Sequence, residues 1–231
     1  MEIRTISQEG YTGKFNYANA AKPGMMVEIL HAIEKLDPGV KFSGLEVSAS
    51  VKRIEHELEF GGVDVFFGLS KSESRTAKFV FVEPALYQAT YQFAVRADDA
   101  VNIATIDDFQ NTANVGIALV NSSESNLDYL KAHGLTIDAS GTNTVINCRK
   151  LMAARGRYYF ASTLSLVEEI KAQKLTSSIR LLPPKFLSAN VYALFSRQAP
   201  GAMVERVRSG LVALDRSGEL KTIFHKYGAL E

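Results

Sequence analysis

The chain has 231 residues, of which 46% are apolar and 22% are charged, a mixture that is typical of a globular protein and excludes intrinsic disorder. Its net charge is +1, with acidic and basic residues interspersed, so no tract is built to bind nucleic acid or an anionic membrane, and no apolar stretch reaches the roughly 20 residues of a membrane helix. The single cysteine, Cys148, excludes an intramolecular disulfide and a multi-cysteine metal site, and the four scattered histidines show no metal-ligand spacing.

The first elements alternate between helix and strand. "GMMVEILHAIEKL" places Met26, Ile29, Leu30, Ile33 and Leu36 on one face, which predicts a helix over residues 24–36. "SASVKRIEHELEFGG" predicts a second helix that starts near Ser50 and stops before the two glycines at 61–62. "VDVFFGL" at 63–69 is a short apolar run of the kind found in strands buried on both faces.

A second series follows along the chain. "ATYQFAVRAD" at 89–98 predicts a strand, and "NVGIALV" at 114–120 predicts another, followed by a helix in "SESNLDYLKAHG" that ends at Gly134. "GRYYFAS" at 156–162 and "NVYALFS" at 190–196 predict further strands. The chain then closes on two amphipathic helices in "MVERVRSGLVALDRSGELKTIFHKYG".

These alternations predict an α/β protein with mixed sheets flanked by helices, arranged as two lobes with a cleft between them. Only "TYQFAVRAD" and "SANVYALFSRQ" read as extended segments that join the two series. We therefore expect lobe 1 to comprise residues 1–94 and 190–231, lobe 2 to comprise 95–189, and hinge strands near 91–97 and 187–193.

The turn "GLSKSESR" at 68–75 raises the question of why an arginine ends a hydroxyl-rich turn that follows a buried strand. One interpretation is a solvated helix start, in which Ser70 or Ser72 caps the helix and Arg75 lies on the surface. The other is an anion clamp, because a planar guanidinium beside hydroxyls and free backbone N–H groups at a helix start matches a carboxylate. Ligand sites in open α/β sheets lie where strands end and helices begin, and "LVNSSES" at 119–125 occupies the equivalent place in the second series. Two such turns favour the clamp.

Taken in order, several segments resemble a known family. The segments are "GMMVEILHAIEKL", "GGVDVFFGLSKSESR", "FVEPALY", "VGIALVNSSESNL", "LMAARGRYYFAS", "ALFSRQAPG" and "LDRSGELKTIFHKYG". They resemble the extracellular solute-binding proteins of family 3, the type II periplasmic binding proteins that serve polar amino-acid transporters. The resemblance covers nearly the whole chain.

The resemblance implies roles for individual residues. In that family the arginine of the first turn grips the ligand α-carboxylate, and Arg75 falls on that position, with Ser70 and Ser72 at the hydroxyl positions and Gly68 lining the pocket. The second lobe contributes backbone N–H groups at a helix start, where this chain has Asn121, Ser122 and Ser123. Val120 stands where the family has glycine, a departure that makes close backbone approach less easy there.

A larger departure follows in "GRYYFA". Typical members have an aspartate that neutralises the ligand ammonium, and Tyr159 falls on that position. A phenol cannot neutralise a buried ammonium, so an ordinary α-amino acid is a poor candidate ligand unless Glu83 or Glu124 takes over. The alternative is that Tyr159 packs in the core beside its aromatic neighbours. Tyr11 could supply an aromatic wall that the family usually builds from elsewhere.

We therefore expect a periplasmic solute-binding protein whose lobes close over a small carboxylate-bearing molecule and which then meets the membrane permease of an ABC transporter. We expect a monomer with no cofactor, no metal, no nucleic-acid partner and no catalysis, and an export signal absent from this sequence. Two alternatives remain open. One is a ligand-sensing domain that biases a signalling partner, and the other is a dehydratase-like enzyme, for which neither turn contains a histidine.

Overall fold

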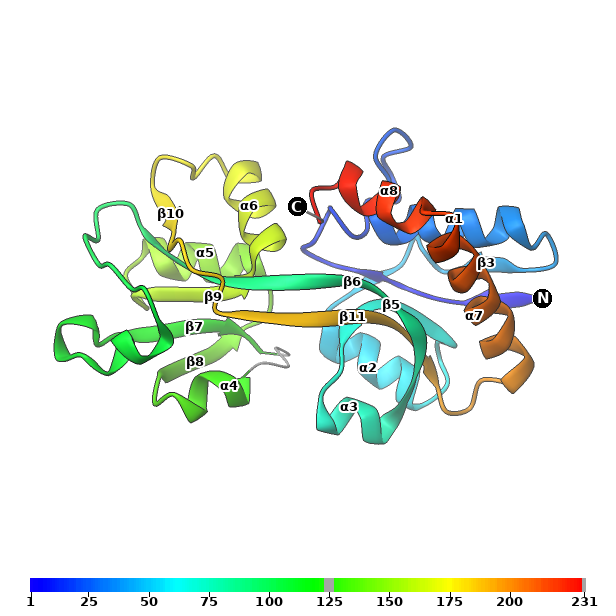
Figure 1. Cartoon of the computed structure of the whole chain (residues 1–231), viewed down its shortest axis with the longest axis horizontal. Coiled ribbons are helices and arrows are strands. Elements are labelled where there is room, and N and C mark those ends of the chain that lie inside the picture. The colour runs from blue at the N-terminus through cyan, green and yellow to red at the C-terminus, as the bar shows by residue number, and fades with distance from the viewer. Residues whose placement is uncertain (123–126, 230–231) are drawn as a thin grey trace. The chain divides into compact units, whose positions relative to one another are not determined.

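A computed structural model describes residues 1–122 and 127–229 (Figure 1). The chain forms two compact units, Met1–Gln88 with Ala189–Glu231, and Ala89–Ser188, which we call unit 1 and unit 2. The chain passes from one unit to the other within β6 (Phe79–Arg96) and at the start of β11 (Leu187–Ser196). The sequence placed the two boundaries at 94/95 and 189/190. Both units mix helices and strands, so the expected α/β class is confirmed.

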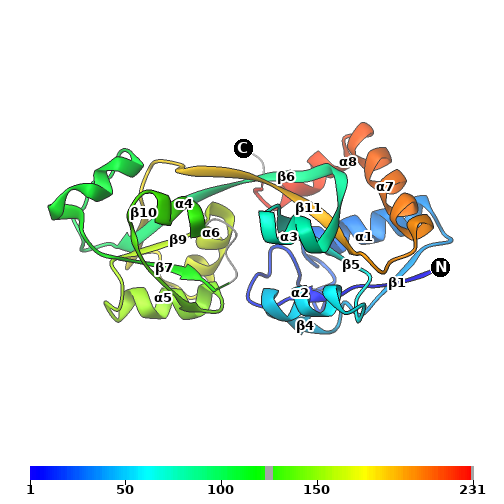
Figure 2. The same cartoon turned by 90° about the horizontal axis from the view of Figure 1, so that it is seen from below.

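Unit 1 is built from short strands and five helices among its described residues. Besides parts of β6 and β11, its elements are β1 (Glu2–Arg4), β2 (Ser7–Gln8), α1 (Met25–Leu36), β3 (Lys41–Ser43), β4 (Ser48–Ala49), α2 (Val51–Glu59), β5 (Val65–Ser70), α3 (Glu73–Lys78), α7 (Gly201–Arg216) and α8 (Glu219–Lys226). The pairs β1–β3 and β2–β4 are parallel, and β5 pairs antiparallel with β11. Helices α1, α7 and α8 pack against one another (Figure 2).

The helix predicted over 24–36 is confirmed as α1, and its buried face includes Met26, Ile29 and Ile33. The prediction is wrong at Leu36, which is 52% exposed because the helix ends there and its last turn leaves the core. The start of α2 differs from the prediction in one respect. Ser50 occupies the N-cap position, but its side chain makes no hydrogen bond to the helix. The two closing helices are confirmed as α7 and α8.

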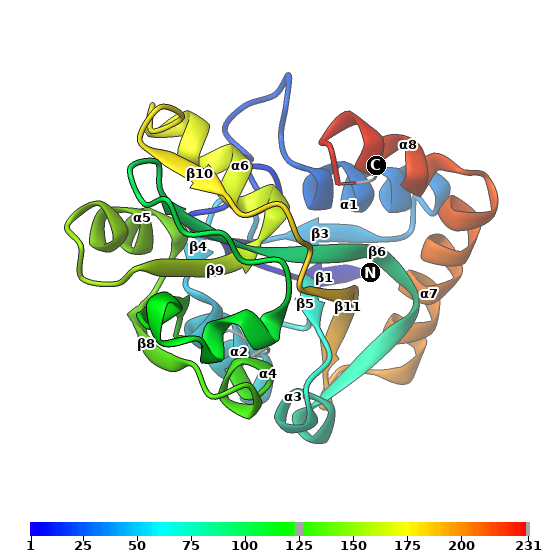
Figure 3. The same cartoon turned by 60° about the vertical axis from the view of Figure 1, so that its left-hand side comes forward.

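Unit 2 contains a sheet in the order β10–β6–β9–β7–β8. Its elements besides β6 are two 3-10 turns (Ile106–Gln110 and Thr112–Asn114), β7 (Ile117–Asn121), α4 (Leu127–Ala132), β8 (Thr136–Gly141), α5 (Thr144–Met152), β9 (Tyr158–Ser162), α6 (Thr163–Ala172) and β10 (Ile179–Leu181). Strands β7, β8 and β9 are mutually parallel, whereas β6 runs antiparallel to β9. Figure 3 shows α5 beside α6, and both helices contact β9.

Strand β9 separates two buried clusters, because its side chains alternate between the faces of the sheet. Tyr158 and Phe160 lie with Phe93 in an aromatic cluster, in which the rings of Phe93 and Phe160 are 4.7 Å apart. Tyr159 lies on the other face in a cluster with Cys148. All three aromatics of "YYF" are fully buried, so each face of β9 is a core face.

Helices α5 and α6 were not predicted from the sequence. The buried face of α5 includes Thr144, Asn147 and Cys148 as well as Leu151, so its apolar pattern is weak. In the described residues, no helix has the length and apolarity needed to cross a membrane.

Candidate functional site

The turn that opens α3 begins where β5 ends. Every residue of β5 is buried, and the chain leaves the sheet after Ser70. Ser72 is extended, and its hydroxyl accepts a hydrogen bond from the backbone N–H of Arg75 at 3.3 Å. This is an N-cap interaction, so of the two predicted caps Ser72 is the one used.

Arg75 is buried, with a side chain that is only 7% exposed. Its Nε donates to Glu55 Oε1 at 2.6 Å, and its Nη1 donates to the carbonyl of Ser70 at 3.2 Å. The interpretation in which Arg75 lies on the surface is therefore wrong. The turn folds the guanidinium back over the end of β5, and the carboxylate of α2 holds it there.

A second cation lies on the same strand end. Gly68 adopts φ +118°, a conformation that favours glycine, and its carbonyl accepts a hydrogen bond from Lys14 Nζ at 2.8 Å. Lys14 Nζ also lies 4.8 Å from the centre of the Tyr11 ring. Tyr11 and Gly68 are predicted site residues, whereas Lys14 is not, because its signal in the sequence is only a lysine inside the turn "YTGKF". We call Tyr11, Lys14, Glu55, Gly68, Ser70, Ser72 and Arg75 the first-unit site.

Glu83 was one candidate partner for a ligand ammonium. Its Oε1 accepts a hydrogen bond from Lys71 Nζ at 2.8 Å, and this bond raises the pKa of Lys71. Lys71 Nζ also lies 4.2 Å from the centre of the Tyr192 ring. Glu83 is exposed and already forms an ion pair with Lys71, so it is poorly suited to neutralise a ligand ammonium. The other candidate, Glu124, lies outside the described residues.

The second group of predicted residues lies at the carboxyl edge of the parallel strands of unit 2. Asn121 ends β7, and its Oδ1 accepts hydrogen bonds from Asn147 Nδ2 at 2.8 Å and from the Tyr159 hydroxyl at 3.2 Å. Two donors fix that oxygen, so the amide nitrogen of Asn121 is turned away from both of them and remains a donor. We call Asn121, Ser122, Asn147 and Tyr159 the second-unit site.

Two other residues were predicted to supply backbone donors to the second-unit site, Ser122 and Ser123. The backbone N–H of Ser122 donates to the carbonyl of Gly141 at 2.7 Å, so it is not available to a ligand and only the hydroxyl remains. Ser123 lies outside the described residues. Gly141 itself is needed there, because a Cβ at that position would lie 2.1 Å from Asn147 Oδ1.

Tyr159 does not lie at an open surface. Its side chain is fully buried in the cluster that contains Cys148, and only its hydroxyl reaches the polar edge, through Asn121. The structure therefore describes the packed arrangement that was left open as the alternative. The buried phenol therefore reaches the polar edge of the sheet only through its hydrogen bond to the amide of Asn121.

More hydroxyl groups lie where helices start in unit 2. Ser162 caps α6 by accepting from the N–H of Ser165 at 3.4 Å, and Thr163 accepts a hydrogen bond from Thr90 at 3.0 Å. The Thr144 and Ser165 hydroxyls are 2.8 Å apart. These residues were not predicted, although "ASTLS", where β9 ends and α6 begins, is a hydroxyl-rich helix start of the same kind as "GLSKSES".

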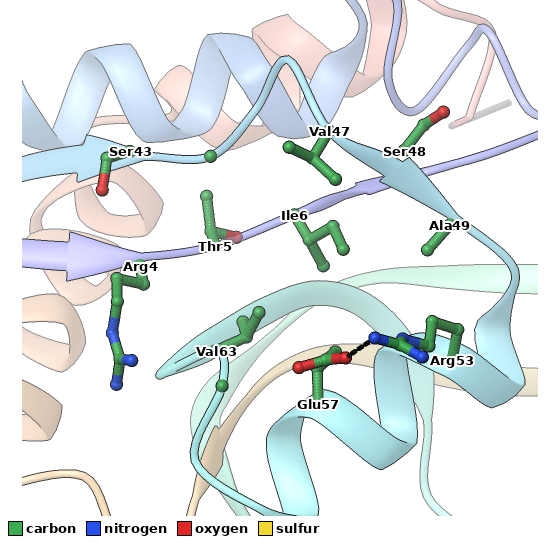
Figure 4. A pocket seen from close by; sticks show the side chains of 12 residues that line it. Arg4, Thr5, Ile6, Ser43, Val47, Ser48, Ala49, Arg53, Glu57 and Val63 are labelled. Atoms are coloured by element: carbon green, nitrogen blue, oxygen red, sulfur yellow. Dashed lines mark ion pairs between the residues drawn. The ribbon is translucent and has the colours of Figure 1, made fainter.

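A hollow of about 410 Å³ lies elsewhere in unit 1 (Figure 4). Ile6, Val47 and Ala49 contribute apolar lining, and one wall is the ion pair between Arg53 and Glu57 of α2. Its charged lining is paired within the protein, since Arg53 pairs with Glu57 and Arg4 pairs with Asp64. The hollow is thus a weaker candidate than the first-unit site.

No cluster of three or more histidine, cysteine or carboxylate side chains that could hold a metal ion occurs in the described parts of the chain. Cys148 is fully buried, and burial raises the pKa of its thiol to about 12. Such a thiol is a poor nucleophile.

Comparison with known proteins identifies the family. The profile of the bacterial extracellular solute-binding proteins, family 3, matches residues 7–229. The chain belongs to this family. The family 3 match confirms the resemblance drawn from the sequence, and the members of this family are binding proteins of the cell exterior. No curated protein matches the chain by sequence.

Several solved structures share the fold of this family 3 protein. A histidine kinase sensor domain with similarity to periplasmic binding proteins has a TM-score of 0.80 at 19% identity, covering 99% of this chain and 97% of that one. The probable amino-acid ABC transporter extracellular-binding protein ytmK from Bacillus subtilis has a TM-score of 0.74 at 18% identity, covering 98% and 97%. The GluR0 ligand-binding core from Nostoc punctiforme, in complex with L-glutamate, has a TM-score of 0.76 at 10% identity, covering 97% and 98%. At these identities the likeness shows the fold alone, and it confirms the expected type II periplasmic-binding-protein fold.

Proposed function

We propose that this protein is a periplasmic solute-binding protein that takes up a small carboxylate-bearing molecule and presents it to the membrane permease of an ABC importer. The observation that supports this best is the placement of Arg75, whose guanidinium is buried at a helix start beside the carbonyl of Ser70. A buried guanidinium binds a carboxylate more strongly than an exposed one, because water screens it less. The family supports the role of a binding protein.

In this proposal Arg75 is the primary anchor, and the amide nitrogen of Asn121 and the hydroxyl of Ser122 supply further donors. Glu55 holds the guanidinium in place before the ligand arrives. Tyr159 acts through Asn121 as a positioning residue. Each of the two sites offers donors by itself, and Glu55 is the carboxylate among their described residues. Closure of the two units on the ligand, which the sequence suggested, stays a prediction, as does the monomeric state.

A sensing role is the second candidate. The fold is also that of a histidine kinase sensor domain, and a sensor would use the same ligand contacts while biasing a signalling partner. Neighbouring genes separate the two roles, since a permease and an ATPase favour transport, whereas a kinase or cyclase favours sensing. Catalysis is not part of the proposal.

A thermal-shift screen with small carboxylates, amino acids and short peptides tests the proposal. A ligand at 100-fold its dissociation constant stabilises the folded state by about 2.7 kcal/mol. Arg75→Lys keeps the charge beside Glu55 but loses the planar fork, so we expect it to lose most of that ligand-induced stabilisation. Arg197→Lys, at an exposed arginine of unit 1, is the matched control. Normal ligand binding by Arg75→Lys and Arg75→Ala would overturn the proposal.

A further inference from the structure

Helix α3, all of whose residues the structure describes, buries no apolar side chain. Within residues 71–78 the buried residue is Arg75, and Ser72 is half-buried. A helix normally keeps its place by burying an apolar face. The position of α3 therefore depends on polar contacts, and so does that of residues 71–75, which we call the Arg75 turn.

Two of these contacts lead from α3 to α2. Arg75 pairs with Glu55, and Lys78 pairs with Glu59 at 2.8 Å. A third contact leads in another direction and starts at Lys71, in the Arg75 turn itself. The turn is therefore held from more than one side.

Lys71 is the first residue after β5, and its side chain reaches across the sheet. The strands of unit 1 lie in the order β5–β11–β6. Lys71 Nζ lies 4.2 Å from the centre of the Tyr192 ring in β11 and donates a hydrogen bond to Glu83 Oε1 in β6 at 2.8 Å. Because neighbouring strands are about 4.8 Å apart, this contact bridges two strand intervals.

Two aromatic rings and one carboxylate surround the ammonium of Lys71. The centre of the Phe81 ring lies 5.8 Å from Nζ, and Phe81 meets Tyr192 edge to face. The hydrogen bond to Glu83 raises the pKa of Lys71, and aromatic faces also attract a cation. Because groups from two strands converge on one nitrogen, they define its position more closely than a lone exposed ion pair would.

Lys71 immediately precedes the residue that caps α3. The hydroxyl of Ser72 accepts from the N–H of Arg75, and the carbonyl of Ser72 accepts from the N–H of Thr76 at 2.9 Å. The strands that Lys71 contacts, β6 and β11, are also those by which the chain passes between the units. Lys71 thus ties the cap of the Arg75 turn to both of these strands.

Building on the proposed function, we propose that Lys71 is a positioning residue of the carboxylate site. Its contacts with Glu83 and Tyr192 fix the direction in which the chain leaves β5, so that Ser72 caps α3 and the Arg75 guanidinium is presented in one place. Lys71 acts through the turn and not by contact with the ligand.

Amide hydrogen exchange, followed by NMR without ligand, tests this inference. Lys71→Met keeps the stem of the side chain and removes the ammonium, so the turn should open more often. The N–H groups of Arg75 and Thr76 should then exchange at least fivefold faster than in the wild-type protein. Lys78→Met, which breaks the exposed pair with Glu59 at the other end of α3, is the matched control and should change both rates less than twofold.

A second measurement connects the turn to ligand binding. The NMR signal of the Arg75 Nε–H group reports on the guanidinium, and titration of the wild-type protein with acetate, lactate and glutamate should shift it. Lys71→Met should raise the dissociation constant of each acid that binds at least threefold. Lys71→Arg can still pair with Glu83 and stack on Tyr192, so it should keep these constants within twofold of the wild type.

The outcomes separate this inference from the proposed function. If Lys71→Met leaves the exchange rates or the dissociation constants unchanged, or speeds exchange within α1 by the same factor, the positioning role is overturned while the carboxylate clamp at Arg75 stands. If none of the three acids shifts the Arg75 signal in the wild-type protein, the proposed function is overturned, and hydrogen exchange still decides whether Lys71 holds the turn. Glu83→Gln, which removes the same ion pair, replaces Lys71→Met if that variant does not fold.

Discussion

Arg75 Nε and Glu55 Oε1 lie 2.6 Å apart, and they join the first turn of α3 to the middle of α2. The Arg75 side chain is 7% exposed, whereas that of Glu55 is 29% exposed. Solvent therefore reaches the Glu55 carboxylate more easily than the Arg75 guanidinium. Under the proposed function, Glu55 would both hold the guanidinium in place and compete with the ligand carboxylate for it.

Glu55→Gln should separate these two effects. Without the carboxylate, Arg75 loses its charged partner, and we expect the free energy of unfolding without ligand to fall by about 1–2 kcal/mol. The ligand carboxylate then no longer competes with Glu55 for the guanidinium, so its dissociation constant should decrease several-fold. Urea unfolding and calorimetry measure the two quantities. Glu59→Gln, which removes the exposed pair with Lys78, is the control, and weaker ligand binding by Glu55→Gln would show that Glu55 only positions Arg75.

Tyr159→Phe removes the hydroxyl that orients Asn121. We expect a loss of about 1 kcal/mol in stability, typical of one hydrogen bond, together with ligand binding weakened by threefold or more. Tyr158→Phe is a matched control, because its hydroxyl donates to the carbonyl of Asn114 at 2.8 Å from the opposite face of β9. It should cost similar stability and leave binding unchanged. If Tyr159→Phe binds the ligand with the same dissociation constant as Tyr158→Phe, Tyr159 has no role in the site.

Zwitterionic amino acids should bind weakly. The side chain that emerges at the end of β7 is the neutral amide of Asn121, which cannot neutralise an ammonium. Calorimetry with glutamine, glutamate, arginine and histidine tests this, and tight binding of any of them to the wild-type protein would contradict it.

Asn121→Asp supplies the missing charge with little change of shape. Its carboxylate can accept the same two donors, from Asn147 and Tyr159. We expect this variant to gain affinity for an amino acid. Tyr159→Asp is unsuitable for that purpose, because it would bury a carboxylate in the core of unit 2.

Asp138 should make the stability of unit 2 depend on pH. The ammonium of Lys150, followed by the hydroxyl and N–H of Ser140, lowers the pKa of Asp138 from 3.8 to about 2. Because the pKa is lower in the folded state, the stabilisation is present above about pH 4 and is lost as the pH falls towards 2. Since the carboxylate is 29% exposed and partly screened, we expect about 1–2 kcal/mol at pH 7.

Urea unfolding of Asp138→Asn beside the wild-type protein measures this contribution. The difference in unfolding free energy should be largest at pH 7 and should shrink between pH 4 and pH 2. Asp128→Asn, at a side chain that is 95% exposed, should show no such difference. If the difference in unfolding free energy does not change with pH, Asp138 contributes through packing and not through its charge.

The sequence by itself determined the fold class and the family, because these depend on patterns that are local in the chain. The apolar spacing of α1, the buried run of β5 and the hydroxyl-rich turn that ends at Arg75 are each legible within a dozen residues. Each of them reflects local physics, either burial of one face or capping of a helix start.

Only the tertiary structure decided what surrounds the site. It paired Arg75 with Glu55, 20 residues away, and brought Lys14 to Gly68, 54 residues away, and neither contact leaves a mark in local sequence. It also buried Tyr159, since alternation along a strand says that neighbours face opposite ways but not that both faces of β9 are covered. Charge pairing and burial depend on which elements pack together, so they follow from the folded chain and not from the order of its residues.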